Sequence, residues 1–226
     1  MKTKTGILFL ALITLFTAHS EADDSVKWSE VRLYHATNKL AAAPTALNNL
    51  TAPDNVPALD TLQSLGIEVD GQYKMLKVGV KFGYTNSSAE PPNAPFPAPA
   101  YLSVSQFTAG LVARIPIVTQ PAYLFDAFVE LGAADTTFNA QTISSGKATL
   151  KKDKNFYQRA GASVAVGSAA VKLYAEVGQE WNKVSDPSSS GTMVTNIPAV
   201  DLSGTYFALG LIISDVPEWL KPSFKK

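Results

Sequence analysis

The sequence of 226 residues contains no cysteine, and this absence excludes several classes of structure. Disulfide scaffolds, thiolate metal sites and cysteine nucleophiles all need residues that the chain lacks. Only two histidines are present, so a histidine-based metal site is not expected either. The formal net charge at pH 7 is +0, which gives no excess charge to attract nucleic acid. We therefore expect no metal, no cofactor and no nucleic-acid partner.

Long hydrophobic runs are also scarce. Beyond residue 22 the longest is Tyr206–Ile213, of eight residues, whereas a membrane-spanning helix needs about 20. The exception is Gly6–Phe16, a mainly apolar run of 11 residues that follows Lys2 and Lys4 and precedes small residues. This layout predicts a secretory signal peptide over residues 1–22. Its removal takes away two lysines and one glutamate and leaves a net charge of −1.

What the chain does have is alternation of apolar and polar residues with a period of two. The stretch Ala170–Val184 shows it best: one face carries Val171, Leu173, Ala175 and Val177, and the other carries Lys172, Tyr174, Glu176 and Gly178. Successive side chains of a strand point to opposite faces, so the pattern predicts a two-faced β-strand.

Seven further segments repeat this pattern, and together they predict eight strands in sequence order. The predicted strands cover about 26–37, 67–74, 76–84, 101–118, 123–132, 155–166, 170–184 and 200–214. The connections between them alternate strictly in length, with long loops at 38–63, 87–100, 139–154 and 185–199 and short turns elsewhere. A helical turn is expected at Leu59–Leu65, and turn geometry places Asp70 opposite Lys81 and Arg114 opposite Asp126. If sequential strands pair, all long loops emerge at one end of an up-and-down barrel, which has no free edges.

Two kinds of barrel share this alternation: a soluble lipocalin-like barrel with apolar residues inside, and a transmembrane barrel with apolar residues outside. Three observations favour the second. The polar face carries many glycines, such as Gly79, Gly110 and Gly161, which suit the narrow interior of an eight-stranded barrel. Aromatic residues of the apolar face, such as Tyr123 and Trp181, gather near the strand ends. The charges of the polar face are balanced in sign, as a buried set requires.

These charges form the candidate site, a network of ion pairs that fills and closes the barrel. It comprises seven acidic and seven basic residues: Glu30, Arg32, Glu68, Asp70, Lys74, Lys77, Lys81, Arg114, Asp126, Glu130, Arg159, Lys172, Glu176 and Glu180. The alternative function for the same residues is a narrow ion path, although equal numbers of both signs give no net selectivity.

The signal peptide, the eight strands and the alternating loop lengths resemble the small bacterial outer-membrane β-barrels, the group of OmpX, OmpW and the membrane domain of OmpA. Near the C-terminus, Gly204, Phe207 and Leu209 match part of the assembly signal of that group, although Leu202 stands where a polar residue is usual and the chain continues to Lys226. The resemblance implies an all-β fold, an eight-stranded antiparallel up-and-down transmembrane β-barrel in the outer membrane. It also implies contact with outer-membrane lipid and recognition by the barrel-assembly machinery.

The predicted organisation is therefore a signal peptide (1–22), an outer-membrane barrel (23–214) and a periplasmic tail (215–226), most simply as a monomer. We expect a structural or surface-interaction role. The alternatives are a narrow pore or transporter of small molecules, an outer-face lipid-modifying enzyme, and a soluble ligand-binding barrel. His35 lies on the apolar face without a serine of the same parity nearby, so no catalytic residue is assigned. Four lysines of the third long loop, Lys147, Lys151, Lys152 and Lys154, are either solvated or in contact with lipopolysaccharide.

Overall fold

The computed structural model describes residues 27–73, 75–92, 99–193 and 196–214, and the predicted signal peptide and C-terminal tail lie outside these ranges. The elements are β1 (Lys27–Leu40), α2 (Thr45–Thr51), η1 (Ala52–Asp54), β2 (Thr61–Tyr73), β3 (Leu76–Ala89), β4 (Tyr101–Thr119), β5 (Tyr123–Thr142), β6 (Gly146–Gly167), β7 (Val171–Ser185), β8 (Ser188–Gly191), β9 (Ala199–Asp201) and β10 (Gly204–Ser214).

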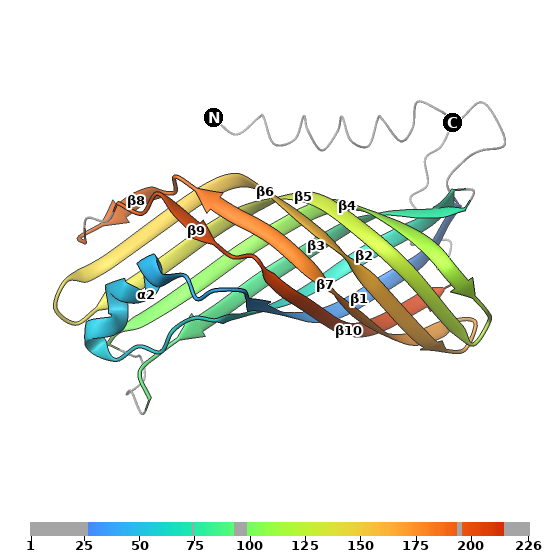
Figure 1. Ribbon diagram of the computed structural model, residues 1–226, viewed down its shortest axis with the longest axis horizontal. Helices are drawn as coiled ribbons and strands as arrows, with labels where there is room; N and C mark the ends of the chain where they lie inside the picture. The colour runs from blue at the N-terminus through green and yellow to red at the C-terminus, as the bar shows by residue number, and fades with distance from the viewer. Residues whose placement is uncertain (1–26, 74, 93–98, 194–195, 215–226) are drawn as a thin grey trace.

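Eight antiparallel strands close into a barrel in the ring order β1-β2-β3-β4-β5-β6-β7-β10, and β10 pairs again with β1. The short strands β8 and β9 extend the wall at one end, where they pair with β6 and β7. This end also carries α2, while short turns occupy the opposite end (Figure 1). The predicted fold, an eight-stranded antiparallel up-and-down barrel, is confirmed. No helix in the described ranges is long and apolar enough to cross a membrane.

Two predicted registers are wrong. Tyr73 pairs with Leu76, and in this register Lys81 stands opposite Glu68 instead of Asp70. The β4–β5 register likewise places Arg114 opposite Phe128, with an irregularity between Pro116 and Val118. Shifting a hairpin by two residues keeps every side chain on its face, so the alternation of the sequence does not distinguish these registers.

The third predicted long loop is also wrong, because residues 139–154 are mostly strand. β5 continues to Thr142 and β6 begins at Gly146, so the two strands form a long hairpin with only residues 143–145 at its tip. The helical turn predicted at Leu59–Leu65 falls instead at Thr45–Thr51, because Thr61 already belongs to β2. Pro44 precedes this helix, and Leu47 anchors it in the barrel with no exposed surface.

The faces of the strands invert along the barrel. In the half nearer the short turns, exposed apolar side chains such as Leu131 and Leu209 cover the outside of the barrel, and we call this surface the belt. Charged side chains are buried inside the barrel at the same level. Beyond this belt the order reverses: on β4, Leu102 and Val104 are fully buried inside, while Ser103 lies on the outside. Alternation alone predicts one continuous apolar face on each strand and does not predict this change.

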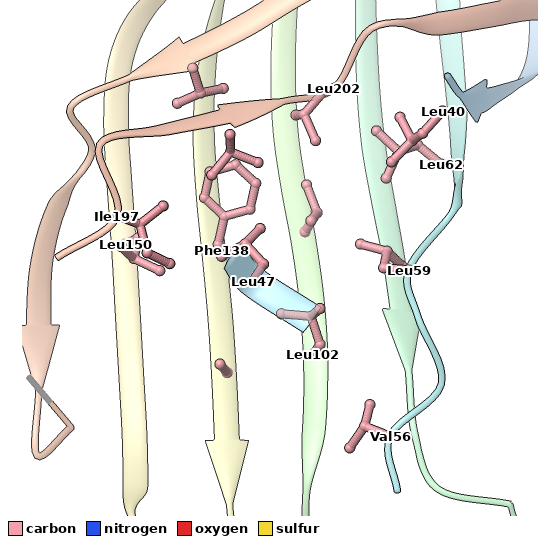
Figure 2. Packing of buried hydrophobic residues seen from close by; sticks show 14 of the residues in the cluster. Leu40, Leu47, Val56, Leu59, Leu62, Leu102, Phe138, Leu150, Ile197 and Leu202 are labelled. Carbon is pink, nitrogen blue, oxygen red and sulfur yellow. The ribbon is translucent and has the colours of Figure 1, made fainter. Parts of the chain in front are cut away.

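The inverted half has its own apolar core inside the barrel wall, which we call the outer core. Figure 2 shows Leu47 of α2 beside Phe138 of β5, with Leu150 of β6 and Leu102 of β4 around them. Its buried residues are Leu40, Leu47, Val56, Leu59, Leu62, Ala100, Leu102, Val104, Phe138, Ala140, Leu150, Val184, Ile197, Val200 and Leu202. The first long loop and the segment before β9 therefore fold into the mouth of the barrel and fill it.

Candidate functional site

The barrel interior at the level of the belt is filled by charged side chains, which we call the ionic layer. Twelve of the residues assigned to it from the sequence are buried: Arg32, Glu68, Asp70, Lys77, Lys81, Arg114, Asp126, Glu130, Arg159, Lys172, Glu176 and Glu180. Glu30 keeps 12% of its side-chain surface exposed at the turn end of the layer, where its carboxylate lies 2.6 Å from Lys77 Nζ. Lys74 lies outside the described residues.

Arg114 of β4 is the hub of this layer. Its guanidinium donates two hydrogen bonds to the carboxylate of Glu68, of 2.6 and 2.7 Å. It donates further bonds to Glu176 of β7, at 2.8 Å, and to Asp126 of β5, at 3.2 Å. A planar guanidinium with several donors suits such multiple contacts with carboxylates, and bidentate pairs of this kind are among the stronger hydrogen bonds in proteins. One side chain thus ties four strands of the ring together.

Two ion pairs cross the full width of the lumen. Lys81 Nζ of β3 lies 3.1 Å from Glu176 Oε1 of β7, and these strands stand opposite each other in the ring of eight. Arg32 Nη2 of β1 lies 3.3 Å from Asp126 Oδ2 of β5, a second opposed pair of strands. Contacts of this length across the diameter leave no open passage between the side chains concerned.

Aromatic rings complete the filling of the ionic layer. Lys81 Nζ lies 4.7 Å from the ring centre of Tyr34 and 5.2 Å from that of Tyr206, and the guanidinium of Arg159 lies 4.7 Å from the ring centre of Tyr206. The hydroxyl of Tyr157 donates to Glu130 at 2.6 Å. Cations over ring faces gain electrostatic attraction in a site without water. These tyrosines were not predicted as members of the site, although Tyr34 alternates in phase with Arg32 on β1 and Tyr157 alternates in phase with Arg159 on β6, which places both on the inner face.

Inward glycines make room for these rings. A Cβ atom on Gly132 would lie 2.6 Å from Tyr157 Cε1, and one on Gly110 would lie 2.7 Å from the Tyr157 hydroxyl. Real Cβ atoms do not approach other atoms so closely, so the two glycines form the space that the ring occupies. This gives a specific reason for the small residues that the sequence analysis noted on the polar face.

A layer of amides separates the ionic layer from the outer core. Asn182 of β7 donates to Gln106 at 3.3 Å and to Glu180 at 2.9 Å, and it accepts a bond of 2.8 Å from Asn155. Gln106 in turn donates to Thr136 at 2.7 Å. Uncharged polar groups that bond to one another and to Glu180 avoid a direct boundary between buried charge and hydrocarbon. The lumen is therefore filled in three successive layers, which are ionic, amide and apolar.

The residues weighed for other roles lie outside the lumen. His35 is exposed on the outer face of β1, where its register neighbours are Leu65 and Leu209. Lys147, Lys151 and Lys154 are exposed on the β5–β6 hairpin, and Lys151 pairs with Asp153 at 3.2 Å. Within the described ranges no group of three or more His, Cys, Asp or Glu side chains is arranged to hold a metal ion.

Comparison with known proteins gives structural similarities only. No family model and no curated protein matches the sequence. The crystal structure of Neisserial surface protein A matches with a TM-score of 0.48 and 10% identity over 84% of this chain and 98% of that chain. CarO of Acinetobacter baumannii matches with a TM-score of 0.41 and 13% identity, over 83% and 97%. The outer membrane protease OmpT from Escherichia coli matches with a TM-score of 0.41 and 6% identity, over 84% and 95%. The assignment of the barrel rests on the strand pairing and the two faces described above.

Proposed function

We propose that the protein is an integral outer-membrane barrel with a sealed lumen and that it acts as a structural element of the membrane. The end that carries α2 and the outer core faces the cell surface. Membrane insertion is supported by the belt, in which side chains such as Leu173 and Val166 are 70% and 60% exposed. In water such a surface would be a large apolar patch, whereas in a bilayer it contacts lipid. The belt on β5 runs from Tyr123 to Ala133, about 11 residues. At about 3.3 Å per residue and a tilt of about 40° these residues span about 28 Å, close to the thickness of the hydrocarbon region.

The observation that carries the sealed lumen is the pair of ionic contacts between opposed strands, Lys81 with Glu176 and Arg32 with Asp126. An ion crossing the barrel would have to break such contacts, and the outer core closes the far end independently. An eight-stranded barrel is only just wide enough for its own side chains, so it offers no second path.

Single-channel recording in a planar lipid bilayer tests this proposal. The purified, folded protein should give no steady openings, and its band on a gel should shift only after boiling, as expected of a closed barrel that resists detergent. Steady, discrete openings of the unmodified protein would contradict the sealed lumen and favour the pore. A protein that stays in solution without detergent would contradict membrane insertion.

The other functions are less well supported by the geometry. A lipocalin-like soluble barrel needs an apolar interior that faces its ligand, but here the interior of the belt is charged and the exterior is apolar. An outer-face enzyme based on His35 needs a nucleophile within hydrogen-bond reach, and the residues paired with His35 on both sides are leucines. We therefore propose a non-enzymatic role.

A further inference from the structure

Acidic side chains outnumber basic ones at the centre of the ionic layer. Over the described residues, six acidic and four basic side chains of the layer keep at most 5% of their surface exposed. A buried charge without a partner is costly, so an excess of carboxyl groups at this depth needs compensation. The acidic residues are Glu68, Asp70, Asp126, Glu130, Glu176 and Glu180, and the basic residues are Arg32, Lys81, Arg114 and Arg159.

Five of the six carboxyl groups have a hydrogen-bond donor at each of their two oxygens. Asp126 Oδ1, for example, accepts bonds from Arg114 and Ser163, and its Oδ2 accepts one from the Arg32 guanidinium. Asp70 is the exception in the described part of the chain. Its Oδ2 accepts a bond of 2.8 Å from Arg32 Nε, whereas its buried Oδ1 has no partner.

The surroundings of Asp70 Oδ1 explain why no donor reaches it. This oxygen fills the space that a side chain on Gly79 of β3 would occupy. The position of a Cβ atom on Gly79 would also lie 2.8 Å from the carbonyl oxygen of Val69 and 3.0 Å from a methyl group of Val112. Neither an acceptor nor a methyl group can donate a hydrogen bond to a carboxylate oxygen.

A second carboxyl group, that of Glu68, lies beside Asp70 on the inner face of β2. The two side chains are in hydrogen-bond contact, and they share their arginine partners. Arg32 Nε lies 2.8 Å from Asp70 Oδ2 and 3.9 Å from Glu68 Oε1. Arg114 Nε lies 2.6 Å from Glu68 Oε1 and 3.9 Å from Asp70 Oδ2. Ionised carboxylates are acceptors only, so a hydrogen bond between them requires a proton that one group donates to the other.

The cations around this pair are not reserved for it. Arg32, Lys81 and Arg114 are the basic side chains within 4.0 Å of the pair in the described ranges. Because the same three cations also serve other carboxylates, they do not fully neutralise both members of the pair. These other carboxylates are Glu30, Asp126, Glu130 and Glu176.

We propose that Glu68 and Asp70 share one proton in the folded barrel, so that the pair is a proton-binding site inside the sealed lumen. The proton lies between the two carboxyl groups and converts a contact between acceptors into a charge-assisted hydrogen bond. The unpaired Oδ1 then belongs to a neutral acid, which costs less to bury than an ion. The inference rests on the sealed lumen proposed above, because an open passage would let water supply the missing partner.

Infrared spectroscopy of the folded barrel in detergent micelles at pH 7 tests the proposal. The C=O stretching band of a protonated carboxyl group is separate from the carboxylate bands and shifts when deuterium replaces the proton. Exposed carboxyl groups are ionised at this pH and do not contribute. We expect the band in the wild type and in the control E180Q, which removes a buried carboxyl group away from the pair. In D70N the band should be absent.

Urea unfolding gives a second readout with a matched substitution. D70N keeps an acceptor for Arg32 and gains an N–H donor for Glu68, so its unfolding equilibrium constant should stay within about threefold of the wild type. D126N makes the same change at a carboxylate that accepts bonds at both oxygens. It should raise that constant about tenfold or more.

Absence of the band from the wild type would overturn the proposal, and so would a band that persists in folded D70N. Equal destabilisation of D70N and D126N, or failure of D70N alone to fold, would also overturn it. Asp70 would then be an ion, completed by a water molecule that bridges to Arg32 Nη1, another buried atom without a partner. The heat-dependent gel shift reports folding in each variant. The conductance experiment on the wild type is independent of these results, so failure of the proton site is distinguishable from failure of the sealed lumen.

Discussion

At the scale of single residues, the stability of the barrel depends on the ion pairs that the buried side chains of the ionic layer make with one another. Arg114 contacts Glu68, Asp126 and Glu176 with no exposed surface of its own. R114A leaves these carboxylates buried with fewer partners, so we expect the free energy of unfolding to fall by about 3–5 kcal/mol. Urea unfolding in detergent micelles measures it. The exposed pair of Lys151 and Asp153 is the control, because K151A should cost less than about 1 kcal/mol. Similar losses for both variants would contradict a tightly coupled ionic layer.

The space around Tyr157 gives a second prediction at this scale. G132A places a methyl group against the ring, and the backbone carbonyl oxygen of Ala109 would lie only 2.5 Å from the same methyl group. Movement of the ring alone would not relieve the contact with the backbone, so we expect a loss of about 1–3 kcal/mol in the free energy of unfolding. The same urea experiment measures the loss, and Y157F/G132A should remain destabilised because the backbone contact persists. An unchanged midpoint for G132A would show that the wall adjusts freely.

The sequence predicts the face of each charged residue but not its partner. Alternation places Lys81 and Asp70 on the inner face, and both are buried there. It does not choose among registers that differ by two residues, and Lys81 in fact stands opposite Glu68. Long side chains also reach beyond the adjacent strand: Arg114 meets Asp126 diagonally and Glu176 across the lumen. Partners of this kind depend on the closure of the ring, which no local pattern contains.

At the scale of elements, α2 is the part of the first loop that closes the outer core. Leu47 is its fully buried apolar side chain, while the neighbouring Ala46 is exposed. L47D would bury a charge without a partner, so we expect α2 to leave the core. Limited proteolysis should then cut within residues 41–60, whereas the barrel should keep its heat-dependent gel shift. A46D is the matched control and should stay resistant. Equal resistance of L47D would show that the first loop is held mainly by other contacts, such as the 3.0 Å bond from the Ile143 N–H to Asp54 of η1.

The long β5–β6 hairpin shows why some elements could not be predicted from the sequence. Residues 139–154 are polar at most outward positions, which suggested a loop. Most of their buried positions are nevertheless apolar: Ala140 and Leu150 belong to the outer core, and Ala148, the register partner of Ala140, is fully buried. The alternation therefore continues, but with its faces exchanged, because the outside now meets water and the inside meets α2. If the outer face of a strand is assumed to stay apolar along its whole length, such a change is taken for the end of the strand.

At the scale of the whole molecule, the level at which the apolar and polar faces of the strands exchange marks the boundary between lipid and water. Because the chain contains no cysteine, single cysteines can be introduced to measure where this boundary lies. Single cysteines can be placed at three positions of β5: Val129 outside in the belt, Asn139 outside beyond it, and Phe138 inside the outer core. With the barrel in lipid vesicles, a membrane-impermeant maleimide should label N139C rapidly. It should label V129C and F138C at least a hundredfold more slowly, the first because lipid covers it and the second because the core does. In a soluble barrel V129C, which is 54% exposed in the protein alone, would react as fast as N139C. That outcome would remove the basis for membrane insertion. Rapid labelling of F138C alone would instead mean that the outer core opens, and the seal would then rest on the ionic layer.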